Sequence, residues 1–146
     1  MYLYYYFNMK KDIKEDIFSH YGHHKSRTHY HLILVTKYRR QCLDYIRDIV
    51  FEAFRYAEQK SDFRIKCMNI DKDHIHLLVS ISTRYSIEQV IRRIKQLTTN
   101  YIYYNCNTYM NRFFWKKKRV LWSSSYFISS VGSISEHTVK EYINNQ

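Results

Sequence analysis

The sequence predicts an α+β domain in which an antiparallel sheet carries helices on one face. Four segments are predicted to be strands: the first is rich in β-branched and aromatic residues, and the third alternates in polarity. Longer segments between them repeat apolar residues every three or four positions, as amphipathic helices do. The resulting order is β, α, β, β, α, β, α, and its first six elements match the split β-α-β pattern of ferredoxin-like folds.

The first half of this pattern begins with a strand at 29–37. A helix is expected at 43–60, where the apolar residues fall on one side. A second strand at 63–70 leads through a turn at 71–73 to a third strand at 74–82. The apolar residues of the helix are Leu43, Ile46, Ile49, Val50, Ala53, Phe54 and Ala57.

The second half begins with a capping box, a reciprocal pair of hydrogen bonds that starts a helix. Ser86 is the expected N-cap and Gln89 the residue that bonds back to it. A polar, basic loop is predicted at 105–118, followed by a fourth strand at 125–131. Ser135 is then expected to cap a last helix, which would run to the end of the sequence.

Composition bounds the class of protein. The 146 residues include 24 Lys and Arg against 13 Asp and Glu, and 18% are aromatic, so a nucleic-acid partner is favoured alongside the plainer alternative of a basic globular protein. Three dispersed cysteines without a Cys-x-x-Cys pair fit a reducing cytoplasm. Without a long apolar run or a signal peptide, no membrane association is expected. Residues 1–26 are expected to form an appendage, and 27–146 the functional domain.

Two groups of basic residues are candidate contacts for DNA phosphates. One follows the first strand and the other lies on the second predicted helix. A solvated charged face is the alternative interpretation of each group. The candidates are Lys37, Arg39 and Arg40 in the first group, and Arg92, Arg93 and Lys95 in the second.

The segment Asp73-His74-Ile75-His76-Leu77-Leu78-Val79 carries the clearest chemical signal. On a strand, His74 and His76 project from the same face while the apolar residues between and after them face a core. Two imidazoles so close can bind one metal ion, although most such pairs are only the polar face of a half-exposed strand. Mn²⁺ accepts imidazole readily and Mg²⁺ prefers oxygen, so a third ligand with oxygen would suit either ion.

The last predicted helix can supply that oxygen together with a nucleophile. Tyr142 and Gln146 are four residues apart and share a helix face. Near a metal ion, a tyrosine oxygen can attack a phosphodiester and become joined to DNA, while the metal stabilises charge on the departing oxygen. The alternative is that Tyr142, one of 16 tyrosines, serves only in packing.

Other polar residues leave alternatives open. His29 and His31 form a second His-x-His pair, which adjacent strands can bring near the first, and a metal site there is the less favoured interpretation. Asp71 and Asp73 fit a turn best, but either could instead orient a histidine ring.

Four segments, 30–40, 71–77, 121–132 and 139–146, resemble in order the single-tyrosine transposases of small prokaryotic insertion sequences. These enzymes belong to the HUH (His-hydrophobe-His) nuclease superfamily and include REP-associated tyrosine transposases as relatives. The resemblance covers residues from about 27 to the end of the chain, and it depends on the four segments together because each alone is weakly specific.

The resemblance implies a homodimer that binds hairpins at the ends of single-stranded DNA elements. It implies cutting and rejoining of the strand through a 5′-phosphotyrosine intermediate with Mg²⁺ or Mn²⁺. His74 and His76 match the metal-binding histidines, Tyr142 the nucleophile and Gln146 the third ligand. Two alternatives stay open: a domesticated hairpin-processing nuclease, and a DNA-binding protein that has lost catalysis.

Overall fold

Four antiparallel strands form one sheet in the order β2-β3-β1-β4. The structure, a computed structural model, describes residues 27–114 and 118–145. The strand order confirms the predicted α+β, split β-α-β arrangement. The elements are β1 (Arg27–Thr36), the 3-10 turn η1 (Lys37–Arg39), α2 (Arg47–Gln59), β2 (Phe63–Ile70), β3 (His74–Ser82), α3 (Ile87–Met110), β4 (Trp122–Val131) and α4 (Ser133–Asn145).

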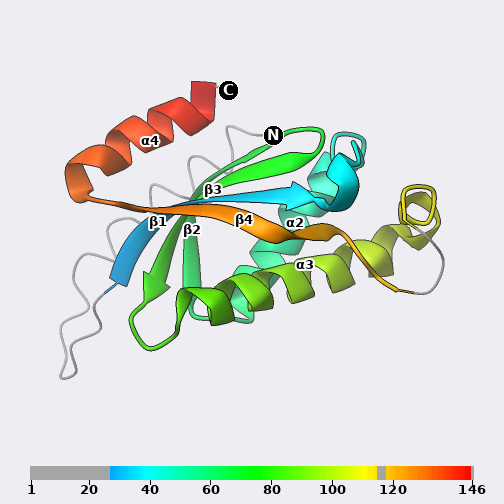
Figure 1. Cartoon of the computed structure of the whole chain (residues 1–146), viewed down its shortest axis with the longest axis horizontal. Coiled ribbons are helices and arrows are strands. Elements are labelled where there is room, and N and C mark those ends of the chain that lie inside the picture. Colours follow the sequence, from blue (N-terminus) through cyan, green and yellow to red (C-terminus); the bar gives the residue numbers. More distant parts are fainter. Residues whose placement is uncertain (1–26, 115–117, 146) are drawn as a thin grey trace.

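The helices divide between the two faces of the sheet (Figure 1). Helices α2 and α3 pack together on one face and enclose the main core, whose apolar side chains come from alternate positions of the strands. Helix α4 lies on the other face, against β2 and β3. The face that the pattern leaves free of α2 and α3 is therefore partly covered by the last helix.

Strands β2 and β3 occupy the predicted residues, but α2 begins at Arg47 instead of residue 43. The backbone before α2 bonds to neighbouring segments instead of to a helical turn. The amide of Leu43 donates to the carbonyl of Lys72 at 3.0 Å, and that of Cys42 donates to the carbonyl of Arg40 at 2.9 Å. Leu43 is fully buried nonetheless, so its apolar character reflects the core and not a helix.

Helix α3 has the predicted capping box, but it extends into the segment predicted as a loop at 105–118. It continues to Met110 across a non-helical residue at Cys106 (φ −144°, ψ 47°). Met110 is fully buried, and the hydroxyl of Tyr109 donates to the carbonyl of Cys42 at 3.0 Å. These contacts hold the last turns of α3 against the core despite their polar sequence.

The last strand and helix both begin earlier than predicted. Strand β4 starts at Trp122, which pairs with Thr36 across an irregularity in the register, and three serines after it hide the alternation that marks a strand. Helix α4 starts at Ser133, so Ser135 lies within the helix and is not its N-cap. Both serines are of a type that begins helices, and the sequence pattern alone does not separate them.

The described contacts between the C-terminal end of α4 and the sheet include one buried side chain and two hydrogen bonds. Ile143 is fully buried in a small apolar cluster that includes Cys67 and Leu78. The side-chain amide of Asn69 donates to the carbonyl of Ile143 at 2.8 Å, and the thiol of Cys67 donates to Asn144 Oδ1 at 3.1 Å. The residue beside Tyr142 is thereby fixed to β2 and β3.

Two expectations from the sequence concern residues that the structure does not describe, and a third stays a prediction. The appendage at 1–26 and the proposed ligand Gln146 lie outside the described residues. The division of the chain at residue 27 stays a prediction. Among the helices of residues 27–114 and 118–145, none has the length and apolar character needed to cross a membrane.

Replacing Ile143 with Ala should release α4 while leaving the sheet intact. The substitution removes the one fully buried side chain among those described on α4, and loss of a buried anchor favours local opening. Hydrogen–deuterium exchange should accelerate in α4 and not in β1 or β3. The matched control is Thr138→Ala, at an exposed position of the same helix. Equal acceleration across β3 would contradict this independent opening.

Candidate active site

The alternation of β3 places His74 and His76 on the sheet face that α4 covers. Ile75, Leu77 and Val79 point to the opposite face and are fully buried in the main core. The centroids of the two imidazole rings lie 5.1 Å apart, with the rings at 70°. The predicted histidine pair is therefore formed by the geometry of the strand itself.

His74 is oriented by the residue that precedes it. Its Nδ1–H donates to the carboxylate of Asp73 at 2.8 Å. The other oxygen of that carboxylate forms an ion pair with Arg39 Nε at 2.9 Å. Asp73 thus orients the ring of His74, the role that the sequence left as an alternative. The Nε2 atom of His74 points away from Asp73 and lies 3.9 Å from Asp71 Oδ2.

His76 is held by His31 on the neighbouring strand β1. Its Nδ1 lies 3.1 Å from His31 Nε2, with the ring centroids 5.4 Å apart and the ring planes inclined at 20°. His76 is only 8% exposed, and burial, followed by the nearby His74 and His31, lowers its pKa to about 4. Burial also lowers the pKa of His31. The imidazoles of His76 and His31 are consequently neutral at neutral pH.

Tyr142 lies beside His76. The centroid of its ring is 6.3 Å from that of His76, with the ring planes at 74°. Its side chain is 54% exposed, so a substrate can reach the phenol. These three predicted site residues come together within a single chain, because Ile143 next to Tyr142 is anchored on β2 and β3.

The donor set suits a metal ion only in part. Both histidines use Nδ1 for a hydrogen bond within the protein, which leaves Nε2 of each as the potential ligand atom. Neutral imidazoles are the form that binds metals. Among the described residues, His, Cys, Asp and Glu side chains form no group of three or more that could hold an ion. Two imidazoles therefore need at least one further ligand, such as the amide expected from Gln146.

A strained turn supports the site from the end of β1. Tyr38 and Arg39 have φ of 59° and 54°, a left-handed conformation that is uncommon for residues other than glycine. Thr36 secures this turn, since its hydroxyl lies 2.8 Å from the carbonyl oxygen of Arg40 and 3.1 Å from that of Asp73. The turn brings Arg39 against Asp73, so this predicted DNA contact is also part of the chain of contacts that orients His74.

The remaining predicted DNA contacts occupy different parts of the molecule. Lys95 is half-buried: it donates to the carbonyls of Ser123 and Ser124 at 2.7 and 3.3 Å, and burial lowers its pKa. Its ammonium therefore stabilises the start of β4. Arg92 and Arg93 are exposed on α3, on the other side of the sheet from the histidines.

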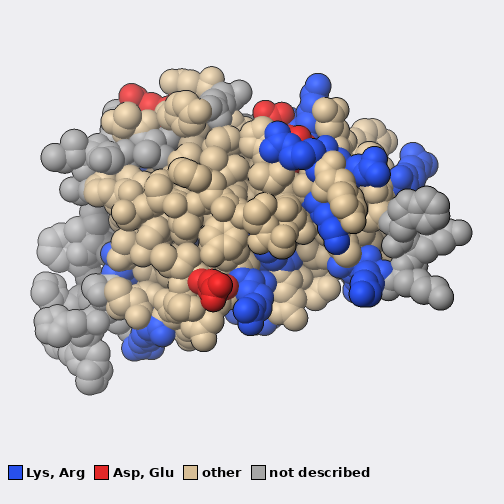
Figure 2. All heavy atoms as spheres, viewed as in Figure 1, with Lys and Arg blue, Asp and Glu red and all other residues tan. Residues whose placement is uncertain are grey.

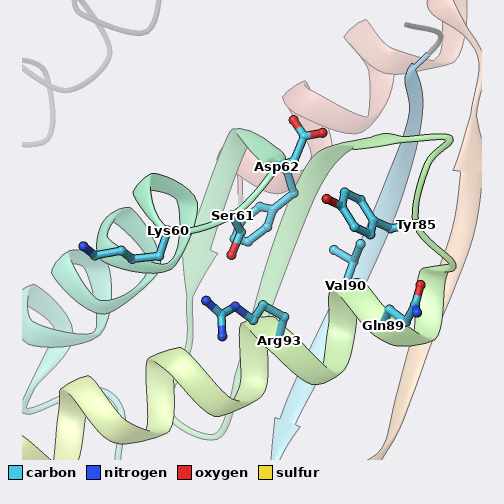
Figure 3. Close-up of a pocket in the computed structure, with 8 residues that line it drawn as sticks. Lys60, Ser61, Asp62, Tyr85, Gln89, Val90 and Arg93 are labelled. Carbon is cyan, nitrogen blue, oxygen red and sulfur yellow. The ribbon is translucent and has the colours of Figure 1, made fainter.

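Arg93 lines a pocket between the end of α2 and the start of α3, together with Lys60 and Tyr85 (Figure 3). Exposed basic residues nearer the histidines belong to the turn after β1, where Arg40 is exposed and Lys37 half-buried. Figure 2 shows Lys and Arg side chains gathered toward the side of the molecule where η1 lies and α3 ends. None of these contacts with DNA is tested by the geometry, and they stay predictions.

The chain belongs to the IS200-like transposase family. The family described as "Transposase IS200 like" matches residues 24–146, which include the histidine pair and Tyr142. The chain is therefore a DNA transposase, an enzyme that cleaves and transfers DNA strands. The ISDra2 transposase TnpA of Deinococcus radiodurans is 25% identical over 118 residues, which cover 80% of this chain and 82% of that protein.

Two solved structures share the fold. One is the crystal structure of a protein from Deinococcus radiodurans R1 described as a candidate transposase, with a TM-score of 0.67, 22% identity and coverage of 88% of this chain and 98% of that chain. The other is a REP-associated tyrosine transposase bound to a REP hairpin, with a TM-score of 0.58, 13% identity and coverage of 86% and 70%. At these identities the likeness concerns the fold.

Stability should fall as acid protonates the buried imidazole of His76. The pKa is about 4 in the folded protein and near 6.5 when unfolded, so the unfolded chain binds the proton first. The contribution is fully present above pH 6.5 and is lost progressively toward pH 4. Urea unfolding of the wild type and His76→Gln at pH 7 and pH 5 should show a smaller loss in the variant. Equal losses in both proteins would contradict the low pKa.

Proposed function

We propose that this transposase cuts and rejoins single-stranded DNA through a covalent bond between DNA and Tyr142. One observation carries the proposal: an exposed phenol lies 6.3 Å, between ring centroids, from one of two imidazoles held on the same sheet face. A nucleophile beside a pair of potential metal ligands suits transesterification at phosphorus. Tyr142 directly precedes Ile143, which is buried against β2 and β3 of the same chain. This packing favours attack by Tyr142 at the site of its own chain.

The reaction proceeds in two balanced steps. The oxygen of Tyr142 attacks the phosphorus atom as the phenol gives up its proton. The bond from phosphorus to the 3′ oxygen breaks, and the departing oxygen takes up a proton to become a 3′ hydroxyl. The 5′ phosphate stays joined to the tyrosine. A 3′ hydroxyl of another strand end then attacks this phosphotyrosine, which restores the phenol and a continuous DNA strand. No external energy source is needed because one phosphoester replaces another in each step.

His74, His76 and Gln146 are the residues proposed to hold Mg²⁺ or Mn²⁺. When bound, such an ion would neutralise charge on the phosphate and on the departing oxygen. The protein contributes the orientation of the two imidazoles: Asp73 accepts from Nδ1 of His74, and His31 lies against Nδ1 of His76. Both rings are held by hydrogen bonds before any DNA binds, so little rearrangement is needed to form the site.

The proposed substrate is single-stranded DNA whose ends are marked by hairpins, and the proposed assembly is a homodimer. The structural neighbour bound to a REP hairpin supports the choice of hairpin DNA as substrate. The net charge of +11 supports binding to phosphates, and Lys37 and Arg40, in and after η1, are the proposed contacts closest to the histidines. Arg92 and Arg93 lie on α3, so they would contact DNA only if the bound strand also extends to that helix.

Tyr142→Phe should abolish the covalent protein–DNA adduct and leave hairpin binding within about twofold, because only the attacking oxygen is removed. Labelled single-stranded element ends with Mn²⁺, followed by denaturing gels and mass spectrometry, measure the adduct. Tyr104→Phe is the matched control, since that tyrosine is also exposed but lies on α3. An adduct that persists in the Tyr142→Phe variant would identify another nucleophile, and wild type that binds without cleavage would indicate loss of catalysis.

Replacing either histidine of the pair should abolish the metal-dependent part of DNA cleavage. His74→Ala and His76→Ala should each reduce cleavage to the level seen in chelator, whereas Asp73→Ala should weaken Mn²⁺ binding by about 10- to 100-fold because His74 loses its orienting partner. Isothermal titration with Mn²⁺ and a cleavage assay measure the two effects. Undiminished cleavage in chelator would exclude a metal role for the pair.

A further inference from the structure

We propose that His31 is a positioning residue, which accepts a hydrogen bond from His76 and so keeps Nε2 of His76 available to a divalent cation. The inference rests on the proposed function, in which His76 is a metal ligand. It adds a residue from β1 to a site otherwise formed by β3 and α4. His31 itself is assigned no contact with the metal or the DNA.

The contact between the two rings is direct and shaped by the sheet. His31 Nε2 lies 3.1 Å from His76 Nδ1, within hydrogen-bond distance, and the ring planes are inclined at only 20°, so the N–H and the lone pair can lie in line. In the antiparallel register, His31 is opposite Leu78 and His76 is opposite Ile33, so the histidines are diagonal neighbours on one face. The Phe127 ring also packs against His31, with its centroid 6.2 Å from that of His31 and the ring planes at 72°.

The chemistry of imidazole decides which way this bond must run. A neutral imidazole has one N–H and one lone pair, on different nitrogens. If His76 donates from Nδ1, its Nε2 carries the lone pair that a cation needs, and His31 keeps its own proton on Nδ1. If His31 donates instead, the proton of His76 sits on Nε2 and blocks coordination. Only the first arrangement is compatible with metal binding, and it requires an acceptor at the position of His31 Nε2.

The two proposed ligands would therefore be held in the same tautomer by different partners. Asp73 accepts from Nδ1 of His74, and His31 accepts from Nδ1 of His76. A carboxylate adds a negative charge that Arg39 balances, whereas His31 adds none. His31 supplies the acceptor on the more buried side of the site, where an unpaired charge would be costly.

The chain offers a matched control for this role. His29 lies on the same strand and the same face, two residues before His31, but its register partners are Ser80 and Val131. The variants to compare are His31→Leu, which has no acceptor, His31→Gln, whose side-chain oxygen reaches the position of Nε2, and His29→Leu. Circular dichroism verifies that each variant is folded.

Two measurements on the full chain test the proposal. Mn²⁺ titration followed by the electron paramagnetic resonance of the free ion should show that His31→Leu weakens binding by about 10- to 100-fold. His31→Gln should restore affinity to within about threefold of the wild type, and His29→Leu should match the wild type. Long-range ¹H–¹⁵N NMR of the metal-free wild type should show His76 protonated on Nδ1, a signature that a merely structural role would not fix.

The outcomes separate this inference from the proposed function. Wild-type affinity in His31→Leu, or a metal-free wild type with the proton of His76 on Nε2, would overturn the role of His31 alone. A wild type that binds no Mn²⁺ would overturn the role of His31 together with the proposed metal site. Neither measurement uses DNA, so the role of Tyr142 is tested separately by the adduct assay.

Discussion

The register of β3 between β1 and β2 is the constraint on which the site depends. Backbone pairing on both sides fixes which residues of β3 face the main core, and His74 and His76 are the ones that do not. A slip of one residue would turn both imidazoles into the core and expose Ile75 and Leu77, at a large cost in apolar burial. Burial of Ile75 and Leu77 thus keeps His74 and His76 on the opposite face of the sheet.

Local patterns predicted the parts of the molecule that local physics determines. Strand ends at 63–70 and 74–82, the capping box at Ser86 and the face of the histidines all follow from alternation or spacing of a few residues. The last turns of α3 escaped prediction because Met110 is buried by residues distant in sequence. Composition marked that segment as polar, but tertiary contacts determine its conformation.

The candidate site also combines residues that local patterns predict with residues whose roles depend on the fold. The sequence placed Tyr142 near the histidines through helix spacing and family resemblance. It left the roles of Asp73 and His31 open, because these depend on which ring nitrogen meets which neighbour across the sheet. The contact of Asn69 has no signal in the sequence, since an amide that bonds to the backbone of a distant helix leaves no periodic pattern. For Lys95, the predicted phosphate contact competes with carbonyls of β4 that only the fold reveals.

The attachment of α4 has a mechanical consequence for the nucleophile. The 13-residue helix is about 20 Å long, and its described anchor, Ile143, lies near one end. The other end of the helix continues from β4 through Gly132, so α4 is joined to the sheet at both ends. Tyr142 directly precedes the buried anchor, so its Cα follows the position of the sheet. The aim of the phenol oxygen at a phosphorus atom is therefore set mainly by the side-chain torsions of Tyr142 and not by movement of the helix.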